Sequence, residues 1–230
     1  TAIRPQVITE MTKILSEDYG NPSSTHSFGR NAKSILELSR KSIAKHLNVS
    51  AQEIIFTSCG TEATNWILRS AVKDLKVKRI ITSKIEPHAV SYTALSLRKE
   101  YDIQVDYVAV RPNGEIDITH LVELLSQEKK TLVSLMHVNN EIGTVLNLDR
   151  ISTICQEHNV LLHSDTVQSI GKTVIDLQKL PIDFIVASAH KFHGPKGVGF
   201  AFVRKNSGLQ PLFYGGEQEK GLRPGTEGVH

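Results

Sequence analysis

The chain has 230 residues, of which 40% are hydrophobic and 22% charged, a composition typical of a folded globular protein. Its net charge of +3 gives no reason to expect nucleic acid or a membrane surface as a direct partner. No apolar run approaches the ~20 residues that a membrane span needs, and residues 1–5 do not resemble a signal peptide. Two cysteines are too few for a disulfide framework, so we expect a reducing, cytoplasmic location.

Apolar, β-branched runs alternate with stretches of helical periodicity, after a first helix-like segment at 5–19. Helices are predicted at 32–47, 62–72, 90–101, 119–127 and 148–158. Strands are predicted at 53–57, 79–82, 104–110, 131–137, 160–163, 183–187 and 198–203. This alternation predicts an α/β fold with a mostly parallel sheet sandwiched by helices.

Polar residues follow several predicted strands at their carboxyl ends. In open parallel sheets these ends share one edge, where ligands bind. We therefore expect a set of side chains to meet there: residues 58–62, Asn139, Asn140, Glu141, Asp165, Gln168, Ser188, His190 and Lys191.

Residues 58–62 form a small, hydroxyl-bearing turn before a predicted helix. They are either an anion site, built from free amides of the first helical turn and the Thr61 hydroxyl, or an ordinary N-cap formed by Ser58 or Thr61. The turn matches neither the dinucleotide-binding glycine pattern nor the P-loop.

Lys191 follows the apolar strand 183–187, and we expect it to be buried. Burying a lysine costs on the order of several kcal/mol or lowers its pKa. A lowered pKa suits a site that needs a neutral, nucleophilic amine. Two interpretations of Asp165 are open. It is a carboxylate at the surface or in a cap, or it is the partner of a protonated heterocyclic nitrogen. No group of histidine, cysteine and acidic residues has a convincing metal spacing, so no metal is expected.

Together, a lysine, a carboxylate and an anion site are what pyridoxal 5′-phosphate requires of a protein. The lysine forms a Schiff base with the cofactor, the acid holds the proton of the pyridine nitrogen, and the anion site binds the phosphate.

Ordered motifs extend this pattern along nearly the whole chain. They read NPSSTH at 21–26, FTSCGTEATN at 56–65, MHVNNEIG at 136–143, DTVQS at 165–169, SAHKFHGPKG at 188–197 and GLRPGT at 221–226. The set resembles the pyridoxal-phosphate-dependent cysteine desulfurases of the class-V aminotransferase family, a group that also holds the selenocysteine lyases.

The resemblance implies a role for each matching residue. Lys191 would be the catalytic residue, binding the cofactor and then moving the substrate α-proton. Asp165 would pair with the pyridine nitrogen and Gln168 with the phenolic oxygen, while Asn140 would contact the substrate carboxylate or the ring oxygen. Gly60, Thr61, Ser188 and His190 would hold the phosphate. Thr226 would reach the cofactor phosphate of a partner subunit, which implies a homodimer.

The resemblance also implies an activity. The enzyme would remove sulfur from L-cysteine, leaving alanine and an enzyme persulfide, and pass the sulfur to an acceptor protein for iron–sulfur clusters or thio-cofactors. The alternatives are a selenocysteine lyase, another class-V aminotransferase, or a truncated scaffold without activity.

Three departures from the family pattern stand out. Pro87 occupies the position of the ring-stacking histidine, so either His88 replaces it after a one-residue shift or stacking is weakened. The downstream sulfur-accepting cysteine and the substrate-clamping arginine have no counterpart here, since neither Cys59 nor Cys155 matches. The opening strand is missing except for Thr1. We therefore expect residues 1–230 to be a cofactor-binding large domain truncated at both ends, without the C-terminal small domain.

Overall fold

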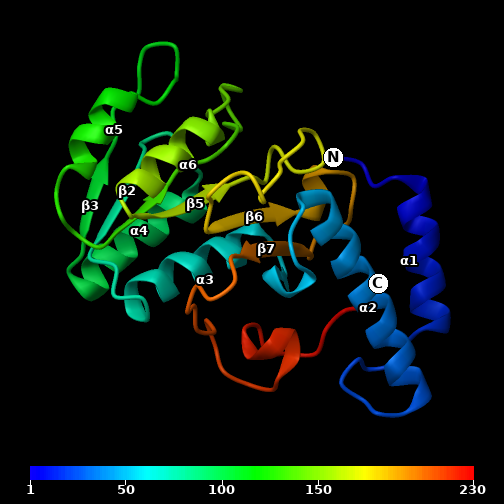
Figure 1. Cartoon of the computed structure of the whole chain (residues 1–230). Helices are drawn as coiled ribbons and strands as arrows, with labels where there is room; N and C mark the ends of the chain where they lie inside the picture. Colours follow the sequence, from blue (N-terminus) through cyan, green and yellow to red (C-terminus); the bar gives the residue numbers. More distant parts are fainter.

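Seven strands form one sheet in the order β1-β7-β6-β5-β4-β2-β3 in the computed structural model, which describes residues 1–230. Their bounds are β1 (Ile54–Thr57), β2 (Arg79–Thr82), β3 (Gln104–Tyr107), β4 (Thr131–Ser134), β5 (Leu161–Asp165), β6 (Phe184–Ser188) and β7 (Gly199–Val203). Only β7 runs against the others, because both β1 and β6 pair antiparallel with it (Figure 1). β1 therefore points the same way as β6, and six strands end at one edge of the sheet.

Helices cover both faces of this sheet. The covering helices are α2 (Ser27–Leu47), α3 (Gly60–Lys73), α4 (His88–Tyr101), α5 (Ile118–Leu125) and α6 (Leu148–Glu157), with short 3-10 turns η1 (Ala51–Glu53), η2 (Ala189–Lys191) and η3 (Gln218–Gly221). The first helix, α1 (Pro5–Glu17), has no buried residue and contributes to neither core cluster. One buried cluster joins the sheet to α3 and α4, and the other joins it to α2, α5 and α6. The expected sandwich of helices around a mostly parallel sheet is confirmed.

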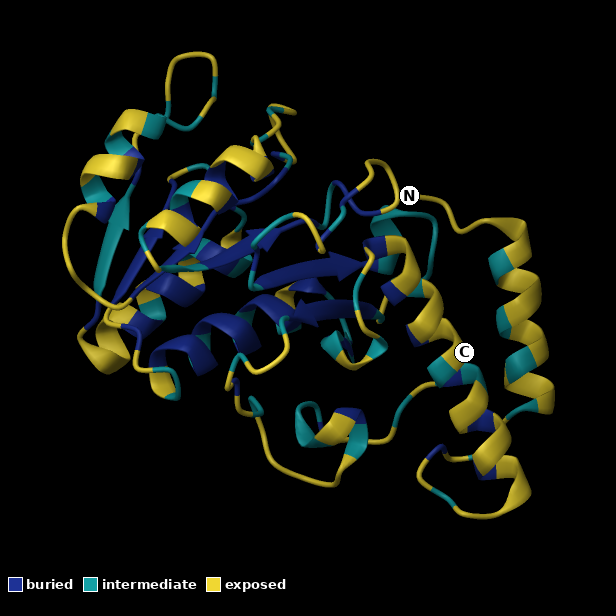
Figure 2. Cartoon of the chain, in the orientation of Figure 1, coloured by how far each residue is buried: buried dark blue, intermediate teal, exposed yellow.

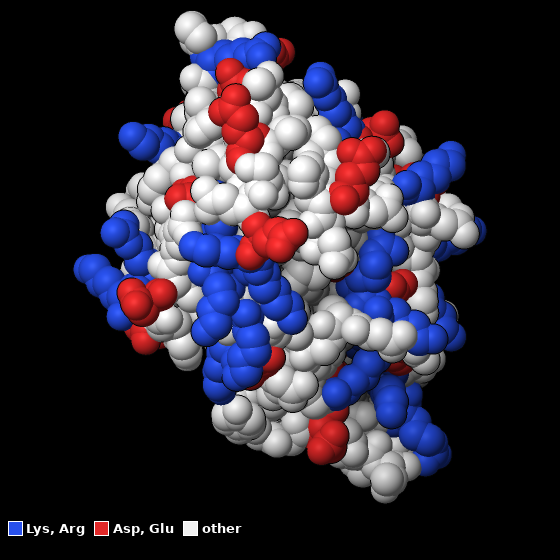
Figure 3. Space-filling view, turned by 60° about the vertical axis from the view of Figure 1, so that its left-hand side comes forward, with Lys and Arg blue, Asp and Glu red and all other residues white.

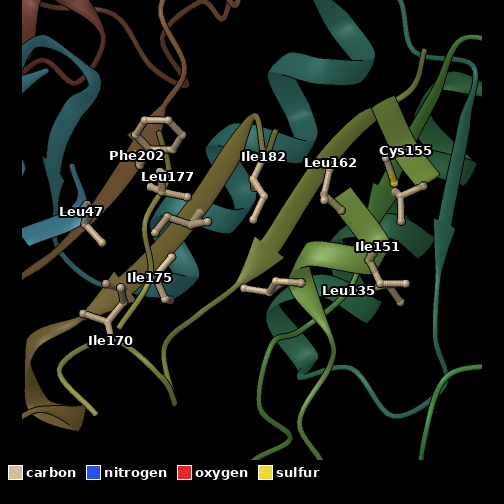
Figure 4. Close-up of a cluster of buried hydrophobic side chains, with 14 of the residues drawn as sticks. Leu47, Leu135, Ile151, Cys155, Leu162, Ile170, Ile175, Leu177, Ile182 and Phe202 are labelled. Carbon is tan, nitrogen blue, oxygen red and sulfur yellow. The ribbon is translucent and has the colours of Figure 1, made fainter. Parts of the chain in front are cut away.

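Successive strand residues supply opposite faces, as a pleated strand requires. Leu132 enters the α3/α4 cluster and Val133 the opposite one, and Val186 and Ile185 divide in the same way. Figure 2 shows the central strands buried and much of the outer helical surface exposed. Figure 4 shows part of the α2/α5/α6 cluster, which includes Cys155.

The predicted elements are all present, with shifts at their ends. The helix predicted at 32–47 begins at Ser27, because the His26 ring accepts a hydrogen bond from the Gly29 amide and caps it. The strands predicted at 104–110 and 131–137 end at Tyr107 and Ser134. Those predicted at 160–163 and 183–187 continue to Asp165 and Ser188, so both polar residues are the last in their strands.

Basic side chains form several separate groups on the face shown in Figure 3, with acidic side chains between them. None of the helices is both long and apolar enough to cross a membrane.

Candidate active site

A cleft of about 320 Å³ opens at the edge where the parallel strands end. It takes residues from the loops after β1, β2, β4, β5 and β6. Of the residues to which the resemblance assigns a role, all but Thr226 line it. Ser58, Glu62, Asn139 and Glu141 were also expected at this edge, but they do not line the cleft. The lining is Cys59, Gly60, Thr61, Pro87, His88, Ala89, Met136, Asn140, Asp165, Val167, Gln168, Ser188, His190 and Lys191. The expected convergence at one sheet edge is thus observed.

One wall of the cleft is the amino-terminal end of α3. Cys59 is its N-cap residue, but no side chain caps the helix, so the alternative of an ordinary N-cap by Ser58 or Thr61 is wrong. The amides of Gly60 and Thr61 have no acceptor within the protein. Free amides and the helix dipole make this end attractive to an anion.

Close packing explains the glycine in this turn. A β-carbon on Gly60 would lie 2.6 Å from Cγ2 of Val167, well inside van der Waals contact. Only glycine lets the first turn of α3 sit this close to the loop after β5.

Asp165 lies at the floor of the cleft and is 7% exposed. One carboxylate oxygen accepts the Val167 amide at 2.9 Å, and no other protein donor reaches the group. Burial raises its pKa to about 6. The surface-carboxylate alternative is therefore wrong, and the group can accept a further N–H donor or cation from within the cleft.

Lys191 ends η2, directly after β6. It is partly exposed rather than buried as expected, because it lies in a 3-10 turn past the strand end, and it lines the cleft. Ser188 is buried, and its hydroxyl lies 3.0 Å from Nδ1 of His190. Burial, together with the nearby charge of Lys191, lowers the pKa of His190 and favours a neutral imidazole.

Asn139 and Asn140 have different roles. Asn139 is buried and shapes its loop by accepting the amides of Glu141 and Ile142 and donating to the Ile85 carbonyl. Asn140 is exposed, and its amide donates only to the Glu141 carboxylate. Asn140 is therefore the one of the pair that can contact a ligand in the cleft.

The rim of the cleft carries further predicted residues. Gln168 is partly exposed and accepts a long hydrogen bond of 3.4 Å from Lys172. The His88 ring stacks on Tyr92, with centroids 4.6 Å apart and planes inclined by 9°. His88 lines the cleft in this position, next to Pro87.

Sequence reasoning did not single out Glu86. This residue is 8% exposed, and its carboxylate accepts hydrogen bonds of 2.9 Å from the Ser83 hydroxyl and the Met136 amide. Burial, with a smaller contribution from the charge of Asp165, raises its pKa to about 8. The sequence shows a glutamate after an apolar strand, but not that a second strand end covers it.

Thr226 and Cys155 lie apart from this arrangement. Thr226 is exposed and lines a neighbouring cavity together with Ser58 and Arg223. Cys155 is fully buried in α6, and burial raises its pKa to about 12. Cys59 lines the cleft next to the free amides of α3.

A mostly parallel sheet thus carries a lysine, a buried aspartate and an uncapped helix end at the edge where its parallel strands end. The profile of the family described as Aminotransferase class-V matches residues 1–226, and the chain belongs to this family.

Within this family, the chain is similar to proteins named as cysteine desulfurases and NifS-like proteins. A cysteine desulfurase IscS of Clostridium botulinum (strain Kyoto / Type A2) is 42% identical over 229 residues, which are 99% of this chain and 57% of the relative. A solved structure named NifS-like protein superposes with a TM-score of 0.96 at 42% identity, covering all of this chain and 64% of the other. A structure described as SspA in complex with cysteine gives a TM-score of 0.95 at 34% identity, covering 100% and 67%. The resemblance to the cysteine desulfurases is confirmed. The chain spans less than two thirds of the length of the curated relatives it matches.

Proposed function

We propose that residues 1–230 are the cofactor-binding large domain of a cysteine desulfurase that uses pyridoxal 5′-phosphate. The observation that carries this proposal is the meeting of Lys191, Asp165 and the uncapped end of α3 in one cleft. The family match and the names of the relatives support it.

The donor set of the cleft fits this cofactor. Free amides at Gly60 and Thr61, with Ser188 and His190 beside them, suit a phosphate. When bound, pyridoxal phosphate supplies an electron sink that stabilises negative charge at the substrate α-carbon. The unsatisfied oxygen of Asp165 would hold the proton on the ring nitrogen, and Gln168 would donate to the ring oxygen.

Lys191 would bond covalently to the cofactor and, once displaced by the substrate amine, accept the α-proton at Nζ. A proton acceptor must be neutral at that moment, and a nearby neutral His190 adds no further positive charge. Asn140 would orient the substrate carboxylate from the loop after β4.

The sulfur needs a nucleophilic acceptor, and only a thiolate performs that role well. Cys155 is unsuitable, since it is buried and its pKa is raised to about 12. The resemblance places the sulfur-accepting cysteine and the carboxylate-clamping arginine outside residues 1–230, and the relatives that the chain matches are longer than it is. The persulfide sulfur would then pass to an acceptor protein.

Thr226 lines a neighbouring cavity and not the cleft of its own chain. We propose that it completes the phosphate site of a second copy in a homodimer. The cytoplasmic location stays a prediction.

The test is an assay of the full-length protein with L-cysteine and a reductant, measuring alanine and sulfide. We expect equimolar products from the unaltered protein and none from K191A. Selenocysteine in place of cysteine separates a desulfurase from a selenocysteine lyase. Protein that binds the cofactor but releases no alanine from cysteine would contradict the proposal.

A further inference from the structure

β1 is an edge strand, paired with β7 on one side only. Such an edge presents unpaired backbone groups, which proteins satisfy or cover. Here side chains do so at alternate residues. The Ile54 carbonyl accepts from Arg40 at 2.8 Å, and the Phe56 amide donates to Glu219 at 2.8 Å. The Ser58 amide, just past the strand end, donates to Glu62 at 2.8 Å.

Both glutamates are themselves held by arginines. Arg40 binds both carboxylate oxygens of Glu219, at 2.7 and 2.6 Å, and both side chains are almost fully buried. Arg223 binds both oxygens of Glu62, at 2.8 and 3.3 Å, with 27% and 14% of the two side chains exposed. Forked arginine–carboxylate pairs fix relative orientation as well as adding energy.

These contacts link two parts of the chain that are far apart in sequence. Glu219 and Arg223 belong to the segment 217–226, which ends at Thr226, whereas Ser58 and Glu62 bracket the free amides of Gly60 and Thr61. One oxygen of Glu62 bonds both Ser58 and Arg223. Movement of the segment would therefore act directly on the turn that leads into α3.

We propose that Glu62 and Arg223 are positioning residues for the anion-binding turn. Their ion pair docks the segment 217–226 against the turn and holds the Gly60 and Thr61 amides in the orientation that receives a phosphate. This inference rests on the proposed function. Glu62 and Arg223 would act by holding the turn in place, without touching the cofactor themselves.

The test compares two ligands that differ only in the phosphate. The full-length protein, freed of cofactor, is titrated with pyridoxal 5′-phosphate and with pyridoxal. We expect R223Q to weaken binding of the phosphorylated ligand by roughly tenfold, the loss of one good charge-assisted contact, and binding of pyridoxal by less than about twofold. R223K keeps the charge without the fork and should recover part of the loss.

Two further variants complete the design. E62Q keeps an acceptor for the Ser58 amide but removes the ion pair, so it should behave as R223Q does. R69Q is the matched control. Arg69 also lies on α3, and it forms a forked pair with Glu100 of α4 in which both side chains are partly exposed. R69Q should leave both affinities unchanged.

An R223Q protein that binds both ligands as tightly as the unaltered protein, or loses both equally, would overturn the positioning role. Failure of the unaltered protein to bind the phosphorylated ligand at all would instead overturn the proposed function, and this inference with it.

Discussion

Asp165 does not behave as an ordinary surface carboxylate. Its carboxylate is buried with a single amide donor, and burial raises its pKa to about 6. Ionised Asp165 is therefore unfavourable in the folded protein until a cation or an acidic N–H joins it. In the proposed function, the protonated ring nitrogen of pyridoxal 5′-phosphate would be that partner.

The pH dependence of stability without the cofactor follows from this shift. The folded-state pKa lies above the ordinary 3.8, so the stability contributed by Asp165 is full below pH 3.8 and is lost as the pH rises through about 6. D165N should therefore gain stability over the unaltered protein across this window, by up to about 3 kcal/mol. Denaturant unfolding at pH 4 and pH 7 measures it. An equal difference at both pH values would contradict the assignment.

The contribution of Glu86 to stability should also fall as the pH rises, over a wider pH range than that of Asp165. Its pKa rises from 4.5 to about 8, so its contribution to stability is lost between those values. E86Q keeps a hydrogen-bond acceptor and carries no charge, and should flatten the fall in stability between pH 5 and pH 8 by a few kcal/mol in order of magnitude. Thermal unfolding of both proteins across that range tests this, and parallel curves would exclude a buried protonated Glu86.

At the scale of elements, the site depends on how closely α3 approaches the loop after β5. The sequence predicted a helix after residue 61 and a small-residue turn before it, because the turn chemistry is local. It left open whether the first amides are capped, since the caps are decided by side-chain orientation. Glu62 meets Arg223 across 161 residues, and no local pattern encodes such a pair.

G60A tests the close approach. A β-carbon 2.6 Å from Val167 Cγ2 forces the helix end or the loop to move, so we expect a loss of about 1–3 kcal/mol in stability and weaker phosphate binding. The double variant G60A/V167A removes the clash and should regain part of both. A G60A protein with unaltered stability and affinity would show that the turn is not tightly packed.

At the scale of the whole molecule, the sheet divides two buried clusters and aligns the strand ends. The sequence predicted this arrangement well, because continuous apolar strands alternating with amphipathic helices leave few other folds. The strand order was not predicted, since pairings such as β1 with β7 join distant residues. The expected contact of Thr226 with the cofactor phosphate of a partner subunit stays a proposal, because it requires a second copy of the chain.

The contribution of the core can be measured at Phe184. This side chain is fully buried in the α3/α4 cluster, so F184A should lower the free energy of unfolding of the full-length protein by about 3–5 kcal/mol. V174A is the control, since Val174 is 96% exposed and should change stability by less than about 0.5 kcal/mol. Similar effects of the two substitutions in urea unfolding would contradict the assigned packing.

The central claim is that Lys191 binds the cofactor. The most direct measurement is borohydride reduction of the full-length protein with pyridoxal 5′-phosphate, followed by peptide mass spectrometry. We predict loss of the visible absorption band and a single phosphopyridoxyl group on the peptide that contains Lys191, absent in K191A. Attachment to another lysine such as Lys196, or no attachment at all, would contradict the account.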